Sequence, residues 1–158
     1  DRLDGEDYAV FMDEYLEENI LPVTFSAKII YYNTSEQTDE HQYTDSLEDF
    51  VDGKADYYMG TTDDYSHIQK EMAGRYAIKE YDGSEDRIII RSGLCINGKC
   101  SYETSRAALE ALYYMTGENA QMELCINAGK GLSVNNIIMD TYKTINVEMS
   151  DLKMGGSR

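Results

Sequence analysis

The sequence has no tryptophan, one proline, two histidines and three cysteines among its 158 residues. An odd, low cysteine count is no disulfide framework, and without a CxxC pair a structural zinc site is not expected. Basic residues are scarce too: 14 Lys and Arg against 30 Asp and Glu give a formal charge of −16. Because nucleic-acid binding needs clusters of Lys and Arg, we expect no nucleic-acid partner.

Long apolar runs are also missing. No run of about 18 apolar residues occurs, so the sequence predicts no membrane-spanning helix. The printed sequence shows no basic segment followed by an apolar stretch, and it starts at Asp1 rather than Met. We therefore expect a processed, trimmed or excised piece.

The three thiols leave two alternatives. Cys95 and Cys100 are five residues apart and can bridge a tight loop, which leaves Cys125 free. The alternative, which we favour, is that these thiols are small buried core residues.

Strand and helix patterns alternate along the chain. Strands are expected over 23–32, 55–59, 75–80 and 87–96. Helices are expected over 6–20, from the capping box at 45–48 to Gly53, and over 63–72, 101–115, 116–128 and after 136. Ser101 is expected to cap the helix over 101–115 and Thr116 the one that follows. The helix over 101–115 carries one apolar stripe, formed by Ala108, Leu109, Leu112 and Tyr113. This alternation predicts an α/β or α+β domain. The strand 87–96 has apolar residues on both faces, which predicts cover on both sides.

Tyrosine is abundant, with fourteen residues. Three adjacent pairs occur: Tyr31-Tyr32, Tyr57-Tyr58 and Tyr113-Tyr114. Neighbours on a strand point to opposite faces, so we expect one tyrosine of each strand pair in the core and the other outside. A ring with a hydroxyl suits sugar recognition, and Tyr65, beside the turn at Gly60, is the tyrosine that we expect in a ligand cleft.

Four pieces of the chain follow one another between Ser46 and Asn136. They are FVDGKADY (50–57), SGLCIN with ETSRAALEAL (92–97 and 103–112), YMTGENAQ (114–121) and GKGLSVN (129–135). In this order and spacing they resemble the extracellular solute-binding proteins of ABC sugar importers, which carry F-x-x-G-K-A-A-M, N-x-x-S-x-x-x-E-A-A-x-x-F-L and G-G-L-P-V-N motifs. The chain departs from the family at Thr62, where an aromatic residue often stands, and at Ser133, which replaces a proline.

The resemblance implies a three-layer αβα fold of the type II periplasmic-binding-protein kind. Residues 1–158 then form a single solute-binding-protein-like domain, or a fragment of a two-lobe protein. The implied function is extracellular capture of a carbohydrate or other small polar solute by hinge closure, and delivery to an ABC permease at the membrane. A lipoprotein anchor is implied for the full-length precursor, and neither enzymatic activity nor a cofactor is expected.

The resemblance places the ligand beside two segments that face one crevice across the hinge. The expected ligand-binding residues are Gly60, Thr61, Thr62, Asp63, Tyr65, Ser92 and Gly93. The first segment joins a strand end to a helix start, where N–H groups and short hydroxyls are available to a polar ligand. The alternative for this turn is an ordinary helix N-cap served by Thr62 or Asp63.

A second function class stays open. An acidic, non-enzymatic surface-interaction or adhesion domain would be favoured by a flat face with exposed tyrosines. A hydrolase would need converging carboxylates or a Cys–His pair, and the sequence shows neither at a recognisable spacing.

Overall fold

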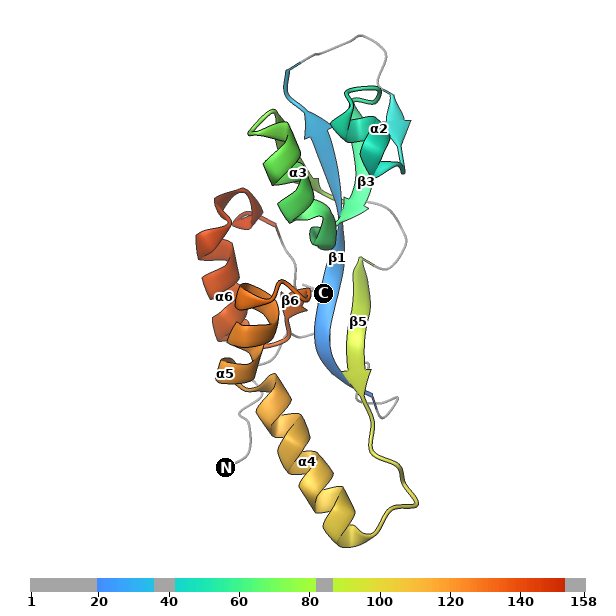
Figure 1. The fold of residues 1–158 in the computed structure, drawn as a ribbon, viewed down its shortest axis with the longest axis vertical. Coiled ribbons are helices and arrows are strands. Elements are labelled where there is room, and N and C mark those ends of the chain that lie inside the picture. The colour runs from blue at the N-terminus through green and yellow to red at the C-terminus, as the bar shows by residue number, and fades with distance from the viewer. Residues whose placement is uncertain (1–19, 36–41, 82–86, 153–158) are drawn as a thin grey trace. The chain divides into compact units, whose positions relative to one another are not determined.

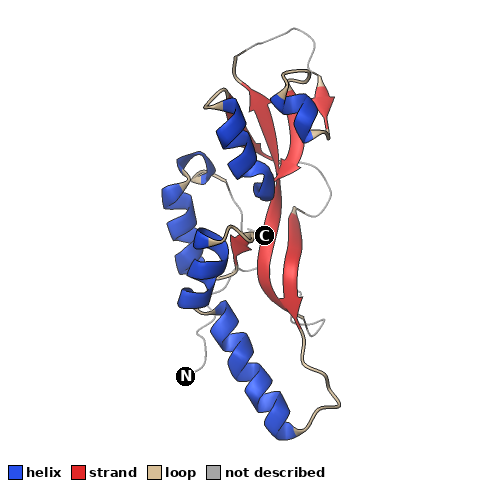
Figure 2. Ribbon diagram, in the orientation of Figure 1, coloured by secondary structure: helices blue, strands red, loops and turns tan. Residues whose placement is uncertain are grey.

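A computed structural model describes residues 20–35, 42–81 and 87–152. These residues form a mixed α/β fold with a six-stranded mixed sheet and five α-helices (Figures 1 and 2). The chain divides into two compact units. Unit 1 comprises Asp1–Phe25, Ile90–Ile145 and Lys153–Arg158, and unit 2 comprises Ser26–Ile89 and Asn146–Leu152. The helix expected over 6–20 lies outside the described residues except for Ile20.

The long strand β1 (Leu21–Asn33) organises the sheet and confirms the strand predicted over 23–32. In unit 2 it lies antiparallel between β3 (Tyr57–Thr61) and β4 (Tyr76–Glu80), with Tyr31 opposite Tyr58 on one side and Ile78 on the other. The short strand β2 (Tyr43–Thr44) extends the sheet as a parallel neighbour of β3. β5 (Ile88–Leu94) also pairs with β1, and both strands begin in one unit and end in the other.

The core of unit 2 is aromatic. The helices α2 (Leu47–Val51) and α3 (Tyr65–Met72) follow β2 and β3 in the chain, and Figure 1 shows α2 beside β3. The ring of Phe50 from α2 lies 6.5 Å from that of Tyr31 and 5.8 Å from that of Tyr58, measured between centroids. Tyr65, at the start of α3, meets Tyr76 edge-on at 6.4 Å. Both helices therefore pack on the sheet face that carries Tyr31 and Tyr58.

The two tyrosine pairs on strands behave as predicted. Tyr31 and Tyr58 are 0% and 7% exposed, whereas their neighbours Tyr32 and Tyr57 are half-buried on the opposite face. The period of two along a strand fixes this alternation. It gives the sheet of unit 2 a second aromatic face.

Unit 1 holds the remaining helices: α4 (Tyr102–Thr116), α5 (Glu118–Gln121), a π-helical segment η2 (Met122–Asn127) and α6 (Asn136–Ile145). The strand β6 (Leu132–Ser133) pairs antiparallel with β1 at Thr24 and Phe25. Gly131 approaches the carbonyl oxygen of Phe25 so closely that a Cβ there would lie 2.8 Å from it. This approach, together with a φ of +111°, explains why a glycine precedes β6.

Helix ends agree in part with the sequence. Ser101 caps α4 as expected, and its hydroxyl oxygen accepts a hydrogen bond from the Thr104 N–H. The cap of α2 is Ser46, one residue after Asp45, which holds the cap position of the box predicted over 45–48. Gly53 and Gly129 adopt positive φ values of +74° and +61° after their helices, as expected of glycine there. Thr116, expected to cap a second helix, is instead the buried last residue of α4, and its hydroxyl donates to the carbonyl of Leu112.

Three expectations about burial are wrong. The β5 residues Arg91–Leu94 are exposed, so this strand is not covered on both faces. The apolar stripe of α4 leaves Leu109 41% and Tyr113 51% exposed. All three cysteines are free, but only Cys125 is buried, whereas Cys95 is exposed. Periodicity tells which side chains share a face, and it does not tell whether anything covers that face.

None of the helices in the described part of the chain is long and apolar enough to cross a membrane.

Candidate functional site

The first predicted ligand segment is the junction of β3 and α3 in unit 2, where the short 3₁₀ helix η1 (Thr62–Asp64) lies. The Asp64 carboxylate closes this junction. Its Oδ2 accepts hydrogen bonds from the Thr61 N–H at 2.9 Å, the Thr61 hydroxyl at 3.2 Å and the Tyr58 hydroxyl at 3.1 Å. Burial, followed by the nearby negative charge of Asp64, raises the pKa of Tyr58, so this hydroxyl stays a donor at neutral pH.

The helix cap is one residue earlier than either candidate from the sequence. Thr61, not Thr62 or Asp63, is the N-cap: its hydroxyl oxygen accepts from the Asp63 N–H at 3.3 Å. With the Asp64 carboxylate bonded back to the Thr61 N–H, the two residues form a reciprocal capping box. The 3₁₀ helix begins directly after β3, so the last residue of the strand, Thr61, is also the cap.

Gly60 is buried, and its lack of a side chain serves packing. A Cβ at this position would overlap the ring of Tyr58 and lie 2.9 Å from the Asp64 carboxylate. Its φ is not positive, so the requirement is one of space and not of backbone conformation. The glycine at position 60 is therefore explained by contacts within unit 2.

Thr62 and Tyr65 are also core residues of unit 2. Thr62 is 5% exposed, and its hydroxyl oxygen accepts a hydrogen bond from the Ala27 N–H at 3.1 Å. Tyr65, which we expected in a cleft, is 2% exposed and donates its hydroxyl to the Glu148 carboxylate at 2.6 Å. Burial raises the pKa of Tyr65, and the hydrogen bond from Tyr65 lowers the pKa of Glu148. The tyrosine thus ties α3 to the 3₁₀ turn η3 (Val147–Met149).

The other predicted contacts are more accessible. Thr61 is half-buried and Asp63 exposed in unit 2, whereas Ser92 and Gly93 are exposed in unit 1. The Ser92 hydroxyl lies 2.7 Å from the hydroxyl of Thr24, across the β1–β5 pair. That the two segments line one crevice stays a prediction.

Sequence reasoning missed Asp64, which holds the turn together. A signal for it was present, because Thr61-x-x-Asp64 has the spacing of a capping box. Glu148 lies 83 positions from Tyr65 in the chain, and no local pattern connects the two.

Reactive chemistry is sparse in the described residues. They contain no group of three or more His, Cys, Asp or Glu side chains that would hold a metal ion. Burial raises the pKa of the Cys125 thiol to about 11, so it is protonated at neutral pH and a poor nucleophile. Two buried hydroxyls, those of Ser26 and Tyr76, make no hydrogen bond with a described residue.

Comparison of the chain with protein-family models, with curated proteins and with solved structures gives no match. The resemblance of residues 46–136 to solute-binding proteins therefore rests on the sequence pieces alone.

Proposed function

We propose that the chain is a non-enzymatic binding protein that captures a carbohydrate or another small polar solute outside the cell. The observation that carries the proposal is the β3–η1 junction, a rigid turn with polar groups at its surface. Asp64 fixes the backbone of this turn from inside through the Thr61 N–H and hydroxyl, while the neighbouring Asp63 is exposed. A preorganised turn that carries an exposed carboxylate offers an acceptor to solute hydroxyls at little entropic cost.

In this proposal the residues that contact the solute are Thr61, Asp63, Ser92 and Gly93. Gly60 and the buried side chains of Thr62 and Tyr65 shape the turn and do not touch the solute. A carboxylate that accepts two sugar hydroxyls is a common way to orient a polyol, and Asp63 is the acidic side chain that we assign to this role.

The fold that goes with this function is three-layer αβα and type II periplasmic-binding-protein-like, with residues 1–158 as a single domain or as a fragment of a two-lobe protein. Binding would select a closed state that an ABC permease recognises, and a lipoprotein anchor in the full-length precursor would keep the protein at the cell surface.

The test is calorimetric titration of the chain with a panel of mono- and oligosaccharides. We expect saturable heat with at least one sugar. Asp63→Asn should weaken that binding about 10- to 150-fold, since hydrogen bonds to a charged group contribute about 1.5–3 kcal/mol. The matched control is Asp52→Asn, an exposed aspartate at the end of α2. No heat with any sugar, or equal losses in both variants, contradicts the proposal.

One observation favours the second candidate, an acidic surface-interaction or adhesion domain. Several tyrosines are exposed: Tyr43 at 59%, Tyr102 at 79%, Tyr113 at 51% and Tyr114 at 67%. Exposed tyrosines are typical of protein contact surfaces. This candidate replaces the first if no sugar binds and if Tyr114→Ala abolishes adhesion to a cell surface.

A further inference from the structure

The sheet face of unit 2 opposite α2 and α3 carries a row of three tyrosines. Tyr43 on β2 lies opposite Tyr57 on β3, and Tyr57 lies opposite Tyr32 on β1. The ring centroids are 4.8 Å and 6.1 Å apart, with interplanar angles of 21° and 28°. The three rings, here called the tyrosine row, are thus stacked across three neighbouring strands.

This face remains accessible. Tyr43 is 59% exposed, and Met59, two residues beyond Tyr57 and therefore on the same face, is 50% exposed. Among the described strands β2 is the last on this side of the sheet, so the tyrosine row ends at the ring of Tyr43. The outer side of that ring is where a further flat group can continue the stack.

Positive charge accompanies the tyrosine row. Lys79 on β4 holds its ammonium group 4.9 Å from the ring centroid of Tyr57. Lys79 forms no ion pair with any described carboxylate, whereas Lys70 on α3 pairs with Glu71 at 3.5 Å. Among the described residues, the contact of this exposed lysine is therefore with an aromatic ring and not with a carboxylate.

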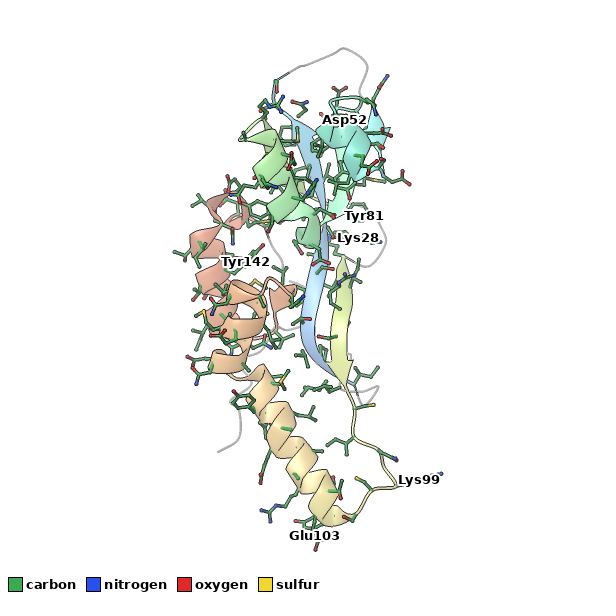
Figure 3. All side chains as sticks on the ribbon, in the orientation of Figure 1. Lys28, Asp52, Tyr81, Lys99, Glu103 and Tyr142 are labelled. Carbon is green, nitrogen blue, oxygen red and sulfur yellow. The ribbon has the colours of Figure 1, made fainter. Side chains whose placement is uncertain are left out.

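A second lysine lies on the same face of the sheet. The ammonium group of Lys28 lies 5.6 Å from the ring centroid of Tyr81, and Figure 3 shows the two side by side next to β1. Lys28 alternates with Ile30 and Tyr32 along β1, so it lies on the same sheet face as the tyrosine row.

We propose that the tyrosine row and Lys79 form a binding surface for an oligosaccharide that carries a carboxylate, such as a chain of uronic acids. The C–H face of one sugar ring stacks on Tyr43. The tyrosine hydroxyls can donate and accept hydrogen bonds to sugar hydroxyls, and the Lys79 ammonium group pairs with the carboxylate. This surface uses none of the residues of the solute site proposed above.

Size favours a sugar over a protein as the occupant. A stable protein interface buries about 800 Å² on each partner. Tyr43, at 59% exposed, offers on the order of 100 Å² of side chain, and Met59 is the other large apolar side chain exposed on this face. That area fits one or two sugar rings. Short acidic oligosaccharides also carry few charges. Their repulsion from the acidic remainder of the chain is screened by physiological salt beyond about 8 Å.

The test is calorimetric titration of the chain with the trisaccharide of galacturonic acid, and with the neutral trisaccharide of galactose as the comparison. We expect the acidic trisaccharide to bind more tightly than the neutral one. Lys79→Gln and Tyr43→Ala should each weaken its binding about tenfold, which corresponds to about 1.4 kcal/mol. The matched controls are Lys70→Gln and Tyr114→Ala, which remove an exposed lysine and an exposed tyrosine elsewhere.

Asp63→Asn separates this surface from the solute site. Binding of the acidic trisaccharide should be unchanged in Asp63→Asn if it occupies the tyrosine row. Three results would overturn the proposal: no binding to the native chain, equal effects of Lys79→Gln and Lys70→Gln, or equal affinity for the two trisaccharides. A sedimentation experiment in which Tyr43→Ala dissolves a dimer would assign the face to self-association instead.

Discussion

Replacing Gln121 with methionine removes the most connected polar side chain of unit 1. Gln121 is fully buried. Its Nε2 donates hydrogen bonds to the carbonyl oxygens of Val23 at 2.9 Å and Met115 at 2.8 Å. Its Oε1 accepts from the Ser133 hydroxyl at 2.6 Å and the Val134 N–H at 3.1 Å. One amide group thus joins β1, the end of α4 and β6.

The loss in free energy of unfolding in Gln121→Met depends on which hydrogen-bond partners of Gln121 are left unsatisfied. The Ser133 hydroxyl can rotate, and the carbonyl of Met115 lies in a partly buried environment where water can replace the amide. The Val23 carbonyl and the Val134 N–H are buried, and each loses a partner that a thioether does not replace. An orphaned buried polar group costs about 1–3 kcal/mol, so two such groups predict a loss of about 2–6 kcal/mol. Methionine fills nearly the same space, so the cavity contribution is small.

The assay is urea unfolding combined with amide hydrogen exchange, because two units need not unfold in one transition. Exchange should accelerate for amides of β6 and α6 in Gln121→Met, and the free energy of unfolding of unit 1 should fall by the amount given. Gln42→Met, at an exposed position, is the control and should leave stability within about 0.5 kcal/mol. A change of that small size in Gln121→Met itself would refute the reasoning.

Three further predictions test other contacts. The hydrogen bond from Tyr65 lowers the pKa of Glu148, so it stabilises unit 2 at pH values above the ordinary pKa of 4.5 and less as the pH falls below it. The difference in free energy of unfolding between the native chain and Glu148→Gln should therefore shrink on acidification. A difference that grows would contradict this reasoning. Ala73, directly after α3, has a φ of +47°, a conformation that glycine tolerates better. Ala73→Gly should therefore raise the free energy of unfolding by about 0.5–1 kcal/mol. A lower free energy of unfolding in urea titrations would count against this prediction. At pH 8 iodoacetamide should alkylate Cys95 in the folded chain and spare Cys125, which mass spectrometry of the peptides reveals; equal labelling would argue against the buried thiol.

Local patterns predicted the secondary structure well where side-chain chemistry decides it. The β-branched and aromatic run over 23–32 became β1, and Ser101 became the cap of α4. The alternation of Tyr31 and Tyr32 between core and outer face followed from strand geometry alone.

Contacts between residues far apart in the chain account for most of the differences between the sequence-based predictions and the structure. The sequence could not tell whether Tyr65 faces a ligand or the core, because its partner Glu148 lies far along the chain. Gln121 was visible only as one letter of a resemblance, since its role depends on segments brought together by the fold. The apolar stripe of α4 was recognised, but its exposure depends on what packs against the helix.

The most direct test of the central claim maps the solute site by NMR. The amide resonances of the chain are followed while the sugars of the panel are added, an experiment that detects weak binding as well as tight binding. Solute capture predicts that at least one sugar shifts the amides of Thr61 and Asp63 together with those of Ser92 and Gly93. If no sugar in the panel moves these four resonances while the chain is folded, the account of the protein as a solute receptor is contradicted.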